Sequence, residues 1–288
     1  MGREELSMGK WRAVPKDSFL RFAIELGGKY VIMYSGIYQI FDVSEAERME
    51  IIRSRQNELV RRFRALGSDG ELRRQEGEFI GAGQKLLDEA EKAGADITMV
   101  LAAEPVQGHP HRVVSPEILD YVSPLKNSPG PVFTVKMRRA EGMKPQRAIV
   151  LENLQDPGNV GTVLRTADAL GVELVVLCGA CADPWGPKAA RASMGAIFRQ
   201  NVVSVAVEEL RDALGGLALY GAALSPTARD IRALDDRRIA VAIGNEGHGL
   251  SKALLGQCAG QIIIPMRPQA ESLNAAVAAA LCMWELVR

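Results

Sequence analysis

Three polar strings, each following an apolar run, hold the side chains that could do chemistry. The first string spans Glu152–Ala167 and places Asn159 at the opening of a helix. Arg165 lies about two helical turns further on. An Asp-Pro-Gly turn precedes Asn159. Taken alone, Asn159 would be a helix cap and Arg165 a surface charge, so neither residue indicates a function by itself.

The last string lies between a β-branched run, Ile262–Ile264, and an alanine-rich stretch from Ala275 onward that predicts a buried helix. It delivers Ser272 and Asn274 to the start of that helix. Helix starts expose unpaired N–H groups and a positive dipole end, which suit a carboxylate or phosphate. An ordinary strand, loop and helix cap gives the same pattern, so both interpretations stay open at this point.

The middle string, residues 243–250, is a glycine-rich loop after an apolar strand. Glycines allow positive φ and let backbone approach a ligand closely. The loop has neither GxGxxG spacing nor a Walker lysine, so it predicts neither a dinucleotide site nor a P-loop. We interpret His248 in this loop as a solvent-facing residue rather than a catalytic base.

In this order, the three strings resemble the motifs of the SpoU-type (TrmH-like) RNA 2′-O-ribose methyltransferases of the SPOUT class. The first string is highly specific for this family because the spacing from Asn159 to Arg165 is correct. Pro187-Lys188 and Arg191–Ala196 also resemble the family. The resemblance covers residues 148–288 and, more loosely, residues 51–137.

The resemblance implies a deep trefoil knot that holds S-adenosylmethionine, and a homodimer whose helices complete the active site. The cofactor contacts that it implies fall on Gly244, Ile264 and Leu273, with Met266 nearby. An adenine ring needs an apolar slot with a few main-chain hydrogen bonds. A side chain at position 244 is expected to enter that slot.

The resemblance also implies an acceptor site for methyl transfer to a ribose 2′-hydroxyl. Arg165 is expected to grip the adjacent phosphate and stabilise the developing alkoxide, because a guanidinium is too hard to deprotonate to act as a free base. Glu246 would accept the proton or orient Arg165. The reaction needs no metal. The residues implied around the acceptor are Asn159, Arg165, Glu246, Ser272 and Asn274.

The fold class expected is α/β. From Ala148 onward, apolar strands alternate with helices, which predicts a parallel sheet covered on both faces. By resemblance, this knotted methyltransferase domain (148–288) follows a linker (138–147) and a small ribosomal-protein-like α/β RNA substrate-binding domain (49–137). Residues 1–48 form an extension of unknown role, with strands predicted at Tyr30–Tyr34 and Ile37–Phe41, and Met49 is an alternative start.

An arginine-rich stretch opens the substrate-binding domain. Residues 51–66 have the pattern of an amphipathic helix, in which Glu58 alone opposes the basic residues. Two interpretations stay open: a solvated charged face, or a patch whose guanidiniums track RNA phosphates. The arginines concerned are Arg53, Arg55, Arg61, Arg62 and Arg64.

Composition limits the function classes. The 288 residues carry a formal net charge of zero, so RNA binding must come from a local patch. No secretory signal and no membrane-spanning apolar run is visible, which predicts a cytoplasmic protein with reduced thiols. The Cys178–Cys181 pair lacks the partners of a zinc site and follows a strand, so we interpret it as structural.

Several functional alternatives stay open. Within 2′-O-methylation, the added ribosomal-protein-like domain favours large-subunit rRNA over tRNA, by analogy alone. A non-catalytic RNA-binding relative would keep the fold, although Asn159, Arg165 and Asn274 together argue against it. SPOUT enzymes that methylate a base nitrogen of tRNA share the fold but lack the string from Asn159 to Arg165.

Overall fold

The structure, a computed structural model, describes residues 22–26, 29–34, 37–42, 51–125, 130–138, 140, 143–234, 238–267, 269 and 272–288. The chain divides into two compact units, Met1–Ile52 and Arg53–Arg288. In the first unit, β1 (Phe22–Leu26), β2 (Lys29–Tyr34) and β3 (Ile37–Asp42) form an antiparallel sheet. The two strands predicted here are therefore confirmed. The rest of the predicted extension lies outside the described residues.

The second unit begins with a four-stranded sheet of order β4-β7-β5-β6 and its helices, which we call the N-terminal lobe (residues 53–137). Its elements are α2 (Glu58–Ser68), α3 (Gly70–Glu76), β4 (Glu78–Ala82), α4 (Gln84–Lys92), β5 (Ile97–Ala102), β6 (His111–Val113), α5 (Pro116–Val122) and β7 (Val132–Lys136).

Helix α2 begins later than its sequence pattern predicts. The side chain of Asn57 accepts hydrogen bonds from the backbone N–H groups of Leu59 (3.0 Å) and Val60 (3.4 Å). These N–H groups have no partner inside the helix, so Asn57 fixes its start. The prediction of a helix from residue 51 is wrong for residues 51–57. Arg53 and Arg55 therefore precede the helix instead of lying on its face.

The C-terminal lobe (residues 147–288) is built on a seven-stranded sheet of order β10-β9-β8-β13-β11-β14-β12, and every pairing in it is parallel. The parallel sheet predicted from the apolar strands is confirmed, whereas β10 and β12 were not predicted. Its main elements are β8 (Arg147–Glu152), α6 (Pro157–Leu170), β9 (Leu174–Cys178), α7 (Pro187–Ala192), β10 (Asn201–Val205), α8 (Leu210–Leu214), β11 (Ala218–Ala222), β12 (Arg229–Asp230), β13 (Ile239–Ile243), α9 (Lys252–Leu255), β14 (Gly260–Ile263) and α10 (Ala275–Val287).

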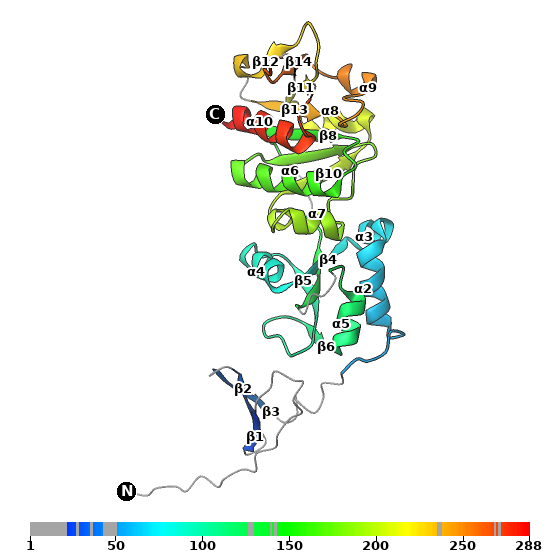
Figure 1. Cartoon of the computed structure of the whole chain (residues 1–288), viewed down its shortest axis with the longest axis vertical. Helices are drawn as coiled ribbons and strands as arrows, with labels where there is room; N and C mark the ends of the chain where they lie inside the picture. Colours follow the sequence, from blue (N-terminus) through cyan, green and yellow to red (C-terminus); the bar gives the residue numbers. More distant parts are fainter. Residues whose placement is uncertain are drawn as a thin grey trace, which may run out of the picture. The chain divides into compact units, whose positions relative to one another are not determined.

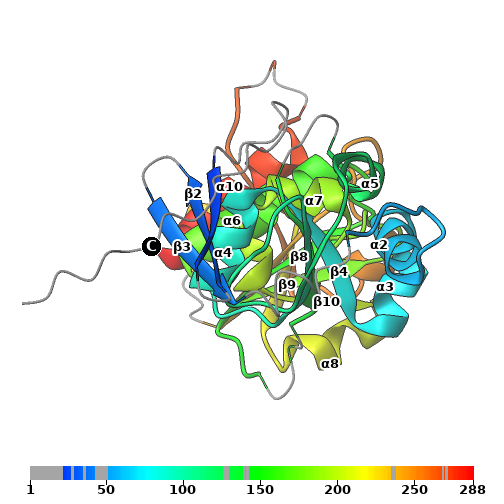
Figure 2. The same ribbon diagram turned by 90° about the horizontal axis from the view of Figure 1, so that it is seen from below.

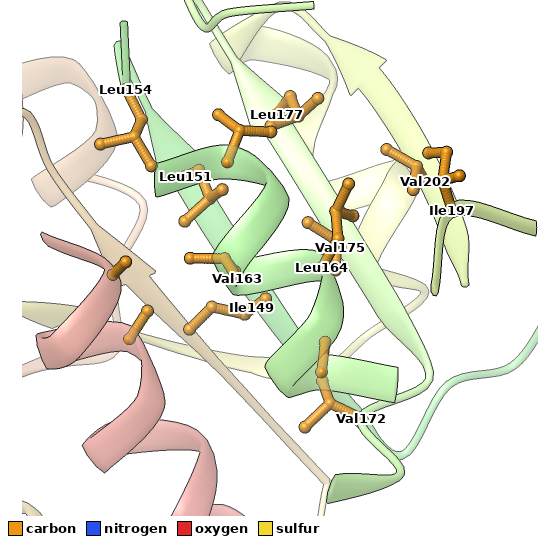
Figure 3. Packing of buried hydrophobic residues seen from close by; sticks show 14 of the residues in the cluster. Ile149, Leu151, Leu154, Val163, Leu164, Val172, Val175, Leu177, Ile197 and Val202 are labelled. Atoms are coloured by element: carbon orange, nitrogen blue, oxygen red, sulfur yellow. The ribbon is translucent and has the colours of Figure 1, made fainter. Parts of the chain in front are cut away.

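Helices cover both faces of this sheet. Side chains alternate along a strand, so Ile149 and Leu151 of β8 join the core under α6 and α10, while Ala148 and Val150 join the core under α8 and α9. Figure 3 shows Ile149 and Leu151 packed beside side chains of α6. Helices α6 and α10 pack directly against each other, side by side in Figures 1 and 2.

The two lobes share one core. Phe198, just after α7, stacks on Phe79 of β4 with ring centroids 5.8 Å apart, and lies 6.5 Å from the ring of Phe133. Arg73 of α3 is 5% exposed and donates two hydrogen bonds to Asp183 (2.9 and 2.6 Å). Because these contacts join the lobes into one compact unit, their division into separate domains at residues 138–147 stays a prediction.

Within the described residues, no helix is long and apolar enough to span a membrane.

An ion-pair network around the buried carboxylate of Glu78 should make the stability of the N-terminal lobe depend on acid pH. Burial raises the pKa of Glu78, but hydrogen bonds from Lys136 and Arg62 outweigh it and hold the pKa below its usual value of 4.5. This stabilisation is present above the unfolded-state pKa and is lost as pH falls through the folded-state pKa. Glu78→Gln should lower the free energy of unfolding near neutral pH by about 2 kcal/mol.

The measurement is urea unfolding followed by circular dichroism between about pH 7 and pH 3. Glu78→Gln should lose less stability than the wild type on acidification, because it has no carboxylate to protonate. The exposed Glu71→Gln is the control and should follow the wild type. Parallel curves for the wild type and Glu78→Gln would contradict this role of Glu78.

Candidate active site

The three polar strings reach one edge of the C-terminal sheet. They follow β8, β13 and β14, and parallel strands put their carboxyl ends at a common edge. Strands β9 and β10 extend the sheet on one side of β8, whereas β13 and β11 lie on the other. Open parallel sheets bind ligands at such a reversal of strand order. The topology therefore favours a site formed by the loops after β8 and β13.

Two asparagines lock these loops together. Asn245 Nδ2 donates to the backbone carbonyl of Asn153 (3.0 Å), and Asn245 Oδ1 accepts from the N–H of Gly247 (2.9 Å). Asn153 has a left-handed φ of 54°, a conformation that asparagine tolerates better than most residues. Its Oδ1 accepts from the N–H of Ala180 (2.8 Å), after β9. The loops after β8, β9 and β13 thus hold one another in place.

A buried carboxylate fixes the far end of the glycine-rich loop. Glu152, the last residue of β8, is 2% exposed and accepts hydrogen bonds from the N–H (2.7 Å) and the hydroxyl (2.6 Å) of Ser251. The Ser251 hydroxyl oxygen also accepts from the N–H of Leu254 and caps α9. These bonds satisfy a carboxylate that would be costly to bury alone, so Glu152 has a structural role.

A chain of hydrogen-bonded side chains joins all three strings. Asn159 Nδ2 donates to Glu246 Oε1 (2.7 Å), and Asn274 Nδ2 donates to Asn159 Oδ1 (3.3 Å). Asn274 Oδ1 also caps α10 by accepting from the N–H groups of Ala276 and Val277. Glu246 and Asn274 are exposed and Asn159 is half-buried, so the chain is accessible to a ligand. We call these three residues the polar cluster.

Asn159 is free for this cluster because another residue caps its helix. Asp156 is the N-cap of α6, and its Oδ1 accepts from the Asn159 N–H (2.9 Å). That hydrogen bond also holds the pKa of Asp156 below its usual value. The interpretation of Asn159 as a cap is therefore wrong. Its side chain projects from the first turn toward Glu246 and Asn274.

An apolar pocket lies between the segments that follow β11 and β14 and the segment that leads into α10. Its volume is about 140 Å³, and it contains three of the four residues predicted to bind a cofactor, together with Ser272. Sequence reasoning missed the segment after β11, although that strand ends at the same edge. The lining residues are Ala222, Ala223, Leu224, Ile262, Ile263, Ile264, Met266, Ser272, Leu273 and Ala278.

Gly244 does not line this pocket. A Cβ atom at position 244 would lie 2.2 Å from the carbonyl carbon of Gly249 and 2.5 Å from the backbone nitrogen of Leu250. The loop folds back on itself there, with two backbone hydrogen bonds between Asn245 and Gly249. The sequence predicted that position 244 must be glycine because a side chain there would enter the adenine slot. The geometry gives a different reason. Glycine is required for closure of the loop.

Arg165 lies apart from the polar cluster. It follows Asn159 by about 9 Å along α6, is exposed, and lines a different cleft of about 900 Å³ with Arg191 and Met194. Within one chain, the structure brings together Asn159, Glu246 and Asn274, but neither Arg165 nor Ser272 forms a hydrogen bond with them in the described residues.

The predicted RNA-binding arginines have different surroundings. Arg55 and Arg64 both lie over the ring of Tyr121, with guanidinium carbons 4.6 and 5.3 Å from its centroid. Arg64 also donates to the Tyr121 carbonyl (3.1 Å). Arg53 and Arg61 are exposed. Cation–π contacts of this kind fix the guanidinium planes and leave other N–H groups free for an anion.

Arg62 differs from the other arginines. Its guanidinium donates to Glu76 (2.9 Å) and to Glu78 (2.6 Å) inside the N-terminal lobe. Burial alone would lower the pKa of Arg62, but the hydrogen bonds that it donates to these two carboxylates outweigh burial and raise the pKa. A guanidinium that is already neutralised by carboxylates contributes little to phosphate binding. We therefore correct the prediction for Arg62 and assign it to the ion-pair network.

The other groups that could be reactive are His248 and the thiols of Cys178 and Cys181, and their surroundings indicate structural roles. His248 is exposed, and its Nδ1 lies 3.4 Å from Asn245 Oδ1. Burial raises the pKa of the Cys178 thiol to about 12 and also raises that of Cys181, which keeps both thiols protonated. Within the described residues, no group of histidine, cysteine and acidic side chains could hold a metal ion.

Comparison with known proteins finds relatives that match most of the chain. The model of the SpoU rRNA Methylase family matches residues 146–284. An uncharacterized tRNA/rRNA methyltransferase of Synechocystis is 34% identical over 257 residues, which are 82% of this chain and 93% of that protein. The 23S rRNA (guanosine(2553)-2′-O)-methyltransferase RlmP of Bacillus subtilis is 30% identical over 250 residues, 83% of this chain and 99% of that protein.

Two solved structures with bound S-adenosylmethionine have a similar fold. An rRNA methyltransferase from Sinorhizobium meliloti has a TM-score of 0.73 at 25% identity and covers 82% of this chain and 97% of its own. The SpoU methyltransferase AviRb from Streptomyces viridochromogenes has a TM-score of 0.69 at 26% identity and covers 81% of this chain and 97% of its own. The similarity extends over both lobes of the second unit.

Because the glycine-rich loop closes on Gly244, we expect alanine to destabilise the protein much more at Gly244 than at Gly247. Gly244→Ala should lower the free energy of unfolding by about 1–3 kcal/mol, because its methyl group would collide with the backbone. Gly247→Ala is the matched control, since its Cβ would meet no atom closer than 3.4 Å. The stability of both variants is measured by thermal unfolding. A Gly244→Ala protein as stable as Gly247→Ala would contradict the closure geometry.

Proposed function

The chain belongs to the SpoU methylase family of RNA methyltransferases, and from this membership we propose that it methylates a ribose 2′-hydroxyl of RNA with S-adenosylmethionine as donor. The observation that carries the proposal is the polar cluster, which joins Asn159, Glu246 and Asn274 at the carboxyl edge of the sheet. The Bacillus subtilis relative, named as a 2′-O-methyltransferase, supports the same atom as acceptor.

The apolar pocket fits part of the proposed cofactor. Its walls of Ile264, Met266 and Leu273 suit an adenine ring. A volume of about 140 Å³ is smaller than a whole ligand pocket of about 300 Å³ or more, so we assign this pocket to one portion of the cofactor. The cofactor supplies an electrophilic methyl group on a sulfonium. The chain supplies alignment and a more nucleophilic hydroxyl.

The acceptor ribose is proposed to bind against the polar cluster. Asn274 and Ser272 would hold the ribose, and Asn159 would orient Glu246 through their hydrogen bond of 2.7 Å. The exposed carboxylate of Glu246 would accept the hydroxyl proton. Arg165 would bind the adjacent phosphate and stabilise the developing alkoxide, since a guanidinium stays protonated.

A homodimer would reunite Arg165 with the cluster. The exposed side of α10 carries Val277, Leu281 and Trp284, which are 48%, 43% and 58% exposed and follow the spacing of one helix face. α6, which carries the exposed Arg165, packs beside α10. We propose that α6 and α10 pair with the same helices of a second copy, so that each site takes its cofactor pocket from one protomer and Arg165 from its partner.

The knot and the RNA class are also proposals. The apolar pocket gathers the segments after β11, after β14 and before α10, as expected if the chain near Leu273 threads through a loop. We further propose that the N-terminal lobe binds RNA. The name of the Bacillus subtilis relative supports large-subunit rRNA over tRNA as the substrate.

The proposed reaction makes a chemically distinct product. RNA is cleaved in alkali when the 2′-hydroxyl attacks the neighbouring phosphate, and a 2′-O-methyl group removes this nucleophile. Protein-free rRNA from a strain lacking the gene should therefore accept radiolabelled methyl groups, and alkali should release the label in an uncut dinucleotide. Label on a mononucleotide base would favour the base-methylating alternative, and no transfer would favour a non-catalytic RNA-binding relative.

The proposed division of labour predicts complementation between two inactive variants. Arg165→Ala should bind S-adenosylmethionine but lose most methyl transfer, while Leu273→Arg should block the apolar pocket. Co-expression with different tags and tandem purification isolates the heterodimer. One of its two sites would then combine an intact pocket with an intact Arg165, giving about half of the wild-type rate. An inactive heterodimer would contradict sharing between protomers, and tags that do not co-purify would contradict the dimer.

A further inference from the structure

Two clefts adjoin where the lobes meet. The larger is the cleft that contains Arg165, about 900 Å³ in volume, between α4 of the N-terminal lobe and α6 and the α7 region of the C-terminal lobe. The second, about 500 Å³, lies between α2 and α7 and contains Arg64 and Lys188. Leu125 and Arg191 line both clefts, so the two clefts adjoin, and we call them together the interlobe groove.

The acidic side chains in the larger cleft are already engaged. Glu89 pairs with Lys92 (2.9 Å) and Arg199 (3.2 Å), and Asp168 also pairs with Arg199 (2.8 Å). Asp88 accepts a hydrogen bond from Gln84 (2.8 Å). Lys92 and Arg199 balance the charges of Glu89 and Asp168, whereas Gln84 leaves the charge of Asp88 in place. The larger cleft is lined by five cations and three carboxylates, so its net charge is positive and favours a polyanion.

The cations along the groove are, by contrast, available. Within the described part of the chain, neither Arg165 nor Arg191 has an ion-pair partner. Lys188 approaches Asp156 only to 3.7 Å, with side chains 71% and 52% exposed, a pair that contributes little. Arg64 has a guanidinium oriented by Tyr121. Both clefts of the groove therefore contain cations that can bind phosphates.

One apolar side chain stands among these cations. Met194 is 56% exposed, lines the larger cleft with Arg165 and Arg191, and has a left-handed φ of 51°. The unbranched, polarizable thioether of methionine adapts to flat apolar groups and aromatic rings. Its position beside two guanidiniums suits the face of a nucleobase whose neighbouring phosphates they bind.

We propose that single-stranded RNA lies along the interlobe groove. In this arrangement Arg64, Lys188 and Arg191 bind consecutive phosphates, and Met194 contacts the base of the nucleotide that Arg165 receives. The inference rests on the proposed function and deepens it by assigning the route of the RNA strand. It also moves the main RNA contacts from the outer face of α2 to the groove.

The route is tested by the salt dependence of RNA binding. The probe is a fluorescein-labelled single-stranded oligoribonucleotide, measured by anisotropy across a series of salt concentrations, with a duplex of the same sequence beside it. Arg64→Gln and Arg191→Gln should each weaken binding about fivefold and lower the salt slope by about 0.7, the value for one phosphate contact to single-stranded nucleic acid. The double variant should lose about twice as much slope.

Arg211→Gln is the matched control. Arg211 is an exposed arginine of α8, which packs against the opposite face of the sheet from α6, so this variant should keep the wild-type slope. Equal slopes for the groove variants and Arg211→Gln would overturn the route. Tighter binding of the duplex than of the single strand would also overturn it. Both outcomes leave methyl transfer by the wild type intact, so they are distinct from failure of the proposed function.

Met194 is tested separately through kinetics. Met194→Asn replaces the apolar side chain with a residue that tolerates the left-handed backbone. With protein-free rRNA and radiolabelled S-adenosylmethionine, its KM for RNA should rise about fivefold while the salt slope of oligonucleotide binding stays at the wild-type value. Met194→Leu, which keeps an apolar side chain, should recover most of the affinity. An unchanged KM for Met194→Asn would overturn the base contact.

Discussion

The parallel pairing of β8 with β13 is the constraint on which the site depends. It brings the carboxyl ends of two strands, distant in sequence, side by side, so that Asn153 and Asn245 can hydrogen-bond across the gap between their loops. The same pairing brings Glu152 within reach of Ser251. These contacts hold the glycine-rich loop in place. As a result, Glu246 accepts a hydrogen bond from Asn159, which lies in the first turn of α6.

Rigidity between the lobes follows from contacts of a different kind. The ring of Phe198 packs on Phe79 and Phe133, and the nearly buried Arg73 binds Asp183 of the other lobe. Breaking such a buried pair leaves an uncompensated charge, which costs several kcal/mol. These contacts hold the two walls of the interlobe groove together. A groove held in this way suits a ligand whose phosphates must reach cations at set positions, since less order has to be imposed on binding.

The separation of Arg165 from the polar cluster is the basis for the pairing of α6 and α10 between protomers that we propose. Their inner faces fill the core of the sheet, as Val163, Leu164 and Met283 are fully buried. Their outer faces carry Arg165 on one helix and an exposed apolar stripe with Trp284 on the other. A residue that lies too far from the site within its own chain can contribute to a site shared between protomers, and the apolar stripe supplies a reason for two copies to associate.

The sequence by itself determined the parallel sheet of the C-terminal lobe, apart from β10 and β12, and the family. Apolar strands alternating with helices predicted the parallel sheet, and the ordered motifs identified a SpoU-type enzyme before any contact was known. These properties depend on local periodicity and on strings of adjacent residues. The tertiary structure decided which residues meet: Asp156 rather than Asn159 caps α6, Arg62 binds carboxylates, and Gly244 permits a loop to close. Sequence could not supply these results, because each depends on the distance between atoms that only the folded chain brings together.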